Sequence, residues 1–288
     1  MGENKKKAFF ITSAKWNNSS RDILSTHEMI SKKFEVIIVS MNINNIASTT
    51  NNDNVYDYAL GIENRYLRWF LSRNISMIPF FTLLFLALKF RPTVIYLLGP
   101  RLHISVVLIR IIFPNMKYIL DFLENPKVFH PSQIPFLKIF GKYVDRALAV
   151  STELREDLKN TFGYKDIRVK YSLPASNFMS DIESCINDNS KIKICFFGNV
   201  CEDRIVHYLV EAANKTSIEI VCDIYGEVFG DGYQEKLDKL NSNNVVRFRG
   251  KLKYSEAQGR LNQYDCGIVF NEINENSKLT IPGKLWEY

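Results

Sequence analysis

The last fifteen residues, 274–288 (NENSKLTIPGKLWEY), combine groups that suit an anionic ligand. They follow an apolar run at 266–270 and are typical of the start of a helix, since Thr280 can cap it and Pro282 suits its first turn. A helix that follows a strand of a parallel sheet points its free amides at the carboxyl ends of the strands, where a diphosphate can bind. Glu287, further along, could accept hydrogen bonds from two neighbouring hydroxyls. The stretch therefore fits a nucleotide, although a surface loop leading into an ordinary amphipathic helix fits it as well.

Length and composition are those of a folded protein with two domains. A chain of 288 residues is long enough for two domains, and hydrophobic and charged fractions of 46% and 24% exclude a disordered chain. The net charge of +6 fits an anionic ligand or a membrane surface but is too small to indicate nucleic acid. The five cysteines form no CxxC pair, and we interpret Cys195, Cys222 and Cys266 as reduced, buried residues of a cytoplasmic protein.

Short apolar runs alternate with helical patterns along the whole chain. This alternation predicts an α/β protein in which each half is a Rossmann-like domain with a parallel sheet covered by helices on both faces. We place the first domain at 1–174, a linker at 175–190 and the second domain at 191–288, with a ligand cleft between the domains. The expected strands are 7–14, 35–41, 55–60, 92–99, 116–123, 144–150, 167–173, 193–197, 218–225, 245–248 and 266–270, and the expected helices are 19–34, 104–113, 152–161, 202–214, 232–240 and 255–264.

Segment 65–90 combines arginines and aromatic residues with a long apolar run. Its uncharged part, 74–88, is shorter than the roughly 20 residues that a spanning helix needs. It could lie in a membrane interface with its arginines at the level of the lipid headgroups. The alternative is a buried crossover helix of the first domain.

Five pieces of the second half occur in the order found in the donor-binding domain of the GT-B glycosyltransferases. They are ICFFGNVCEDR, IYGE with GDGY downstream, VVRFRGKLKYSE, LNQYDCGIVF and IPGKLWEY. Together they resemble the retaining family 4 and its relatives, and VSTELREDL in the first half resembles an element near the end of that family's acceptor domain. The resemblance implies transfer of a sugar from a nucleotide-diphosphate sugar to an acceptor, with no cofactor and without an essential metal.

The resemblance also implies a role for individual residues on the donor side. Glu287 would hold the donor ribose, Gly283 and Lys284 would lie near the diphosphate, and Arg204 would be the cation that follows the first strand of the domain. Cations at this place stabilise the charge that develops on the leaving diphosphate. Arg204 could equally be an ordinary exposed helix residue, and the strand-end glycines could be simple turn residues. The donor-binding candidates are Gly198, Arg204, Gly226, Gly283, Lys284 and Glu287.

The first half departs from the family pattern, because no Gly-rich loop follows its opening strand. Polar residues of that segment could still meet the acceptor or a phosphate. Acidic residues at the end of one expected strand and histidines in loops could act as acid or base, although such residues more often cap helices or are solvated. The acceptor-side candidates are Ser13, Asn17 and Arg21, and the catalytic candidates are Asp121, Glu124 and His130, with His103 a similar case.

The family pattern continues beyond Tyr288, so we expect a truncated glycosyltransferase whose activity as this chain is in doubt. Leu279 stands where many members carry an acidic residue, eight residues before Glu287, and retention of configuration rests on the resemblance alone. We expect a polysaccharide or lipid-linked oligosaccharide acceptor and a cytoplasmic protein that could be peripheral on the inner face of the cell membrane. Two other functions fit: a nucleotide-sugar epimerase of the GT-B type, which needs no acceptor, and a catalytically silent binding protein.

Overall fold

The chain forms two compact units. The computed structural model describes residues 5–12, 21–42, 55–59, 77–129, 131–171, 191–252, 254–286 and 288. The first unit is Met1–Ser172 with Lys278–Ile281, and the second is Leu173–Ser277 with Pro282–Tyr288. The predicted linker at 175–190 lies outside the described residues. The grouping of Lys278–Ile281 with the first unit differs from the predicted domain at 191–288.

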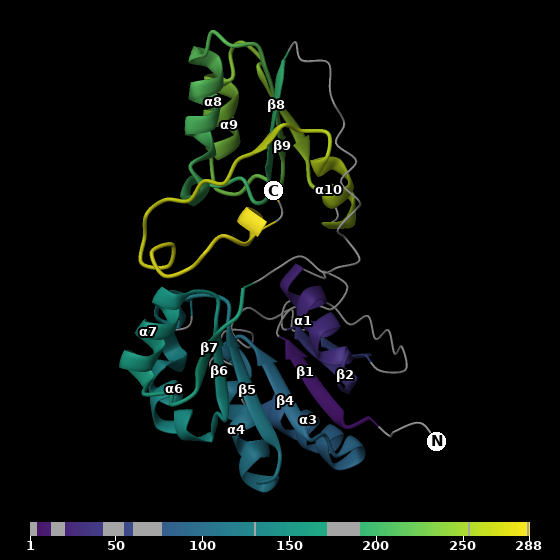
Figure 1. Cartoon of the computed structure of the whole chain (residues 1–288). Helices are drawn as coiled ribbons and strands as arrows, with labels where there is room; N and C mark the ends of the chain where they lie inside the picture. The colour runs from purple at the N-terminus through teal and green to yellow at the C-terminus, as the bar shows by residue number, and fades with distance from the viewer. Residues whose placement is uncertain are drawn as a thin grey trace. The chain divides into compact units, whose positions relative to one another are not determined.

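Seven strands among the described residues of the first unit form one parallel sheet in the order β3-β2-β1-β4-β5-β6-β7. The chain starts in the middle at β1 and builds the sheet outward in both directions, which is the doubly wound arrangement (Figure 1). The strands are β1 (Lys7–Thr12), β2 (Glu35–Asn42), β3 (Val55–Ala59), β4 (Val94–Leu98), β5 (Lys117–Phe122), β6 (Arg146–Ala149) and β7 (Ile167–Val169). The helices are α1 (Arg21–Ser31), α3 (Met77–Phe90), α4 (His103–Ile112), α5 (Pro126–Phe129), α6 (Ile134–Phe140) and α7 (Thr152–Phe162), with short 3₁₀ helices at Pro100–Leu102, Pro131–Gln133 and Gly141–Tyr143.

Both faces of this sheet are buried. Successive residues of a strand point to opposite faces, so Phe9 lies in the core shared with α3, α4, α6 and α7, whereas Phe10 packs on the face that carries α1. This explains why the strands are continuous apolar runs. At the start of α7 the Ser151 hydroxyl accepts a hydrogen bond from the Leu154 amide at 2.9 Å, which confirms the predicted cap.

The second unit repeats the plan with a four-stranded parallel sheet in the order β10-β9-β8-β11. In Figure 1, α8 and α9 lie together on one side of this sheet and α10 lies on the other. The strands are β8 (Ile192–Phe197), β9 (Ile220–Tyr225), β10 (Val246–Gly250) and β11 (Cys266–Gly267). The helices are α8 (Val206–Lys215), α9 (Tyr233–Leu240) and α10 (Tyr254–Leu261), with 3₁₀ helices η6 (Glu202–Arg204) and η7 (Gly283–Trp286).

The structure corrects several details of the sequence analysis. The predicted helix at 202–214 is broken, because Ile205, with a φ of 42°, separates η6 from α8. The predicted strand at 266–270 keeps only two strand residues, and Cys266 is exposed instead of buried because it lies on the outermost strand of the described sheet. Cys195 and Cys222 are buried as predicted, and burial raises the pKa of each thiol to about 12. Helix α6 was not predicted.

Candidate functional site

Two glycines of the candidate donor site lie against each other at the carboxyl ends of β8 and β9. Gly198 has a φ of 138°, and its amide donates to the Tyr225 carbonyl at 2.8 Å. A Cβ on Gly226 would overlap the Gly198 carbonyl oxygen and lie 2.8 Å from its carbonyl carbon. A Cβ on Gly198 would overlap the end of the Lys284 side chain. Gly226 is therefore required by close packing against the main chain, whereas a side chain at Gly198 would displace the end of Lys284.

The C-terminal segment lies over the same edge. The ammonium of Lys284 lies 4.2 Å from the centre of the Phe196 ring, a cation–π distance. The amide of Phe197 donates to the Tyr288 hydroxyl at 3.0 Å, and a Cβ on Gly267 would overlap the Tyr288 ring. Contacts from two residues of the segment thus hold it against the ends of β8 and β11.

Arg204 is joined to the loop that follows β11. Its guanidinium donates to the Asn271 side-chain oxygen, and the amide of Glu272 donates to the Asp203 carbonyl at 2.8 Å. Because η6 comes directly after β8, these bonds keep Arg204 beside the carboxyl ends of β8 and β11. The structure therefore groups Gly198, Arg204, Gly226 and the η7 residues Gly283 and Lys284 in one unit.

This arrangement suits an anion. It offers a guanidinium and an ammonium near the carboxyl ends of the strands, where α/β sheets bind ligands. The sequence predicts that a helix in the last fifteen residues points its amides at a diphosphate. Among the described residues, this segment forms the four-residue 3₁₀ helix η7. Glu287 lies outside the described residues, so the proposed role of that helix and of Glu287 remains a prediction.

Asp121, a catalytic candidate, is an internal residue of the first unit. Its side chain has no exposed surface, and its Oδ2 accepts from the Lys170 ammonium and from the Tyr96 hydroxyl. Lys170 also donates to the Thr26 hydroxyl at 2.8 Å. This carboxylate, which the sequence places at a strand end as a possible acid or base, is buried under α1, and a lysine beyond β7 neutralises its charge. A direct catalytic role for Asp121 remains a prediction.

Of the other candidates in the first unit, the structure describes the side chains of Glu124 and His103. Glu124 is exposed. His103 is fully buried, its Nδ1 lies 2.9 Å from the Tyr118 hydroxyl, and burial lowers its pKa to about 4 against the opposing effect of the Phe136 carbonyl. His103 is therefore neutral near pH 7 and faces the core. Ser13, Asn17 and His130 lie outside the described residues, and the side chain of Arg21 is not described either.

Three residues that contact the candidates Asp121 and Arg204 or the strand β8 were not predicted from the sequence: Lys170, Asn271 and Tyr288. Lys170 directly follows β7 and Asn271 directly follows the apolar run 266–270, so their places at strand ends were the available signal. Tyr288 belongs to the quoted IPGKLWEY piece, but nothing local shows that its hydroxyl meets β8.

Two kinds of feature are absent from the part of the chain that the structure describes. It has no cluster of three or more histidine, cysteine or carboxylate side chains that could hold a metal ion. Nor does any helix there have both the length and the apolar character needed to cross a membrane.

The fold is similar to that of several solved enzymes. The lipopolysaccharide outer core galactosyltransferase WaaB aligns over 92% of this chain and 74% of its own, at 14% identity and a TM-score of 0.63. Sucrose-phosphate synthase from Thermosynechococcus elongatus aligns over 94% and 77%, at 9% identity and a TM-score of 0.69. HepE from Anabaena, solved with UDP and glucose, aligns over 92% and 74%, at 10% identity and a TM-score of 0.60.

A protein from Listeria monocytogenes described as a "putative UDP-N-acetylglucosamine 2-epimerase" is also similar, with 12% identity, 88% of this chain and 71% of its own aligned, and a TM-score of 0.56. No protein-family model and no curated protein sequence matches this chain. The structural similarities confirm the predicted GT-B type of fold, two parallel α/β units of the Rossmann kind.

Proposed function

We propose that this chain is a glycosyltransferase that moves a sugar from a nucleotide-diphosphate sugar to a glycan or lipid-linked acceptor. The observation that carries the proposal is the packing of Gly198, Gly226 and Lys284 at the carboxyl end of β8. HepE, whose fold is similar, was solved in complex with UDP and glucose, and WaaB is a galactosyltransferase with the same kind of fold. These similarities support a nucleotide sugar as the ligand of this edge.

Each residue of the site would have a simple electrostatic or steric task. The glycines would let the two strand ends and Lys284 pack closely, so that the Lys284 ammonium lies beside the diphosphate. Lys284 and Arg204 would balance the negative charge that grows on the diphosphate as the sugar leaves, which is the type of stabilisation that often contributes most to catalysis. Arg204 would exchange its bond with Asn271 for one with a phosphate. Glu287 would hold the ribose hydroxyls.

The test is nucleotide binding by the full chain, measured by calorimetry with UDP and GDP, followed by transfer assays with a panel of nucleotide sugars. Loss of one charge-assisted contact costs roughly 1.5–3 kcal/mol, so Lys284→Gln should weaken nucleotide binding by roughly 10- to 100-fold. Lys239→Gln, an exposed lysine of α9, is the matched control and should bind as the parent does. Equal nucleotide affinity in both variants, or no nucleotide binding by the parent chain, would contradict the proposed site.

A membrane-borne acceptor is part of the proposal. Helix α3 buries Leu83 and Leu86 in the core of the first unit and exposes Phe81, Phe85 and Leu88 by 61%, 63% and 59%. Such apolar residues at a spacing of four and three form one outward face, which suits the acyl boundary of a bilayer. The protein would then work as a peripheral protein on the cytoplasmic face of the membrane, where lipid-linked glycan intermediates are within its reach.

Co-sedimentation with vesicles of phosphatidylcholine and phosphatidylglycerol tests this part. The double variant Phe81→Ser/Phe85→Ser should bind these vesicles several-fold less than the parent, because two inserted aromatic rings are lost. Tyr208→Ser, which removes an equally exposed aromatic ring from α8, should leave vesicle binding unchanged. Vesicle binding that is absent in the parent, or equal in all three proteins, would remove the membrane from the proposal without touching the donor site.

A nucleotide-sugar epimerase is the second candidate function, favoured by the similar fold of the Listeria protein. The two functions differ in what they need. An epimerase changes the free nucleotide sugar when no acceptor is present, whereas a transferase releases the nucleoside diphosphate only as sugar appears on an acceptor. Product analysis by NMR with and without a lipid-linked acceptor therefore decides between them.

A further inference from the structure

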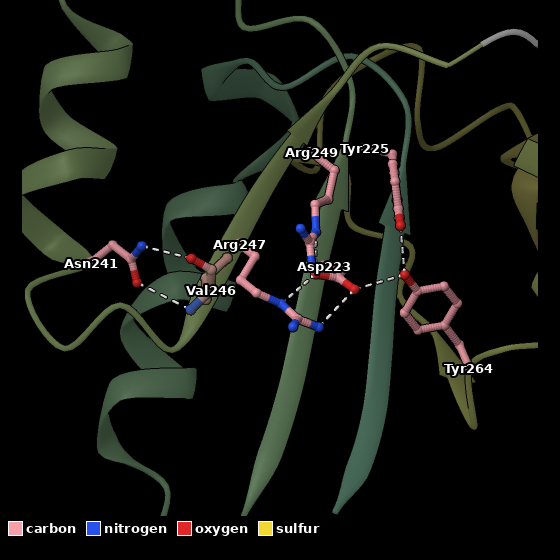
Figure 2. A network of polar contacts seen from close by, with 7 residues as sticks. All are labelled: Asp223, Tyr225, Asn241, Val246, Arg247, Arg249 and Tyr264. Carbon is pink, nitrogen blue, oxygen red and sulfur yellow. Dashed lines mark hydrogen bonds and ion pairs between the residues drawn. The ribbon is translucent and has the colours of Figure 1, made fainter. Parts of the chain in front are cut away.

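The second unit holds a polar cluster on the face of its sheet that α10 covers. Figure 2 shows Arg247 and Arg249 from β10 and Tyr264 converging on the carboxylate of Asp223 in β9. Arg247 donates to both carboxylate oxygens at 2.8 and 3.0 Å, Arg249 donates at 3.0 Å and the Tyr264 hydroxyl at 2.8 Å. Burial acts to raise the pKa of Asp223, but these three donors lower it below the ordinary value. Asp223 is thus a carboxylate anchor that holds two arginines in place.

A pocket of about 320 Å³ opens beside this cluster. Its walls include Arg249, Tyr225 and Tyr264 from the cluster, with Leu252 after β10 and Arg260 from α10. The Arg260 guanidinium lies 5.7 Å from the centre of the Tyr225 ring, and the Tyr225 and Tyr264 hydroxyls are 2.8 Å apart. This volume is at the small end of the range for ligand pockets, which suits a compact ligand.

The charges around the pocket do not balance. Arg247 and Arg249 both pair with the carboxylate of Asp223, and Arg260 adds a further positive charge to the wall of the pocket. Arg249 uses its Nε for Asp223, so both of its Nη groups can serve another acceptor. Within the described residues, Arg260 forms no ion pair. Two guanidinium groups with open donors therefore line one pocket, and paired arginines are suited to bidentate binding of phosphate.

The pocket is separate from the candidate donor site. Lys284 lies over the ring of Phe196, which belongs to the core under α8 and α9. Tyr225 stacks on the next residue, Phe197, with ring centres 4.6 Å apart, on the α10 face. Because neighbouring residues of a strand point to opposite faces, Lys284 and the arginines of the pocket are on opposite faces of the sheet.

We propose that this pocket binds a phosphate-type oxyanion, free or carried on a small soluble molecule. Arg249 and Arg260 hold the phosphate oxygens, and the Gln263 amide, which also lines the pocket, supplies a further donor. The Tyr225 ring and Leu252 form an apolar wall for the rest of such a molecule. This site goes beyond the proposed transfer reaction, since neither the acceptor nor the donor needs it.

Binding of inorganic phosphate to the full chain tests the proposal, measured by calorimetry at an ionic strength held constant with sodium chloride. Arg260→Gln should weaken phosphate binding by roughly tenfold or more, and Arg260→Lys, which keeps the charge but not the planar fork, should weaken it less. Lys239→Gln, which removes one exposed cation from α9, should bind phosphate as the parent does. Lys284→Gln should keep this binding event, which separates the pocket from the donor site.

Hydrogen exchange gives an independent readout of the place of binding. Phosphate should slow amide exchange in α10 and the residues that follow it, 254–264, in the parent chain but not in Arg260→Gln. The proposal is overturned if Arg260→Gln binds phosphate as tightly as the parent, if Lys239→Gln loses binding to the same degree, or if phosphate protects only other segments. Failure of nucleotide binding at the donor site would leave each of these results unchanged.

Discussion

Replacement of Gly226 by alanine should disturb the candidate donor site through a clash between backbone segments. The added methyl carbon would overlap the Gly198 carbonyl oxygen and lie 3.2 Å from a methyl group of Val200. The nearest atoms belong to the main chain, so no change of rotamer can relieve the overlap. Two hydrogen bonds fix the segment in place: Gly226 donates to the Gly250 carbonyl at 2.9 Å, and Gly198 donates to the Tyr225 carbonyl at 2.8 Å. One of the strand ends must therefore move.

The expected loss of stability is roughly 2–4 kcal/mol, because overpacking costs about 1–3 kcal/mol and the shift would break about one hydrogen bond worth roughly 1 kcal/mol. A melt of the whole chain is a poor measure, since two compact units need not unfold together. Hydrogen exchange in segments 192–200 and 220–228 reports on the right strands. Amides there that exchange through opening of the second unit should exchange roughly 30- to 1,000-fold faster in the variant.

Two other glycines sharpen the test. Gly259 lies in α10 with nothing within 4 Å of an added Cβ, so Gly259→Ala should leave exchange unchanged or slow it, because alanine favours a helix by up to about 1 kcal/mol. Gly198→Ala would meet only the flexible end of Lys284, at a φ of 138°, and should weaken nucleotide binding by displacing that lysine. If Gly226→Ala exchanges as slowly as Gly259→Ala, the close packing of Gly198 and Gly226 is not what holds this edge together.

Three further predictions concern contacts of single side chains. As pH falls from 6.5 towards 4, His103 takes up a proton in the unfolded chain but not in the folded chain, where burial lowers its pKa to about 4. The first unit should therefore lose about 3 kcal/mol of its free energy of unfolding over this range, measured by urea titrations. His103→Gln should lose this part of the pH dependence. Ser151→Ala removes the cap that accepts the Leu154 amide and should lower the stability of the first unit by about 1 kcal/mol, measured in the same way. Tyr288→Phe removes the acceptor of the Phe197 amide and should speed exchange of that amide by roughly two- to tenfold.

The strands and most helices could be predicted because their signals are local. The run at 35–41 is apolar throughout and forms β2 (Glu35–Asn42), and the predicted helix at 152–161 begins after Ser151 as α7. An uninterrupted apolar run indicates a strand buried on both faces, and a serine before an amphipathic stretch indicates a cap. Neither signal depends on residues elsewhere in the chain.

The elements that were missed depend on tertiary contacts. Helix α6 (Ile134–Phe140) has seven residues with Pro135 in its first turn, too short for a clear helical period, and Leu137 is its one fully buried residue. Cys266 looked like a core residue because CGIVF is apolar, but exposure depends on whether a neighbouring strand covers it, and β11 is the outermost strand of the described sheet. The pairing of Asp121 with Lys170 joins residues from β5 and from beyond β7. No local pattern contains that information.

The difference between local signals and tertiary contacts also explains how far the candidate site could be predicted. A glycine that ends a helix and one that lies under a ligand-binding segment look alike in a sequence. Gly163, with a φ of 68°, has open space where a Cβ would stand and serves only the end of α7. Gly198 instead lies under Lys284, a residue from the far end of the chain. The order of the five sequence pieces that resemble the GT-B donor domain indicated that Gly198 and Lys284 belong to one site, because successive strand ends of a doubly wound sheet meet at one edge. Only the structure shows that Lys284 lies over Gly198, at the end of β8.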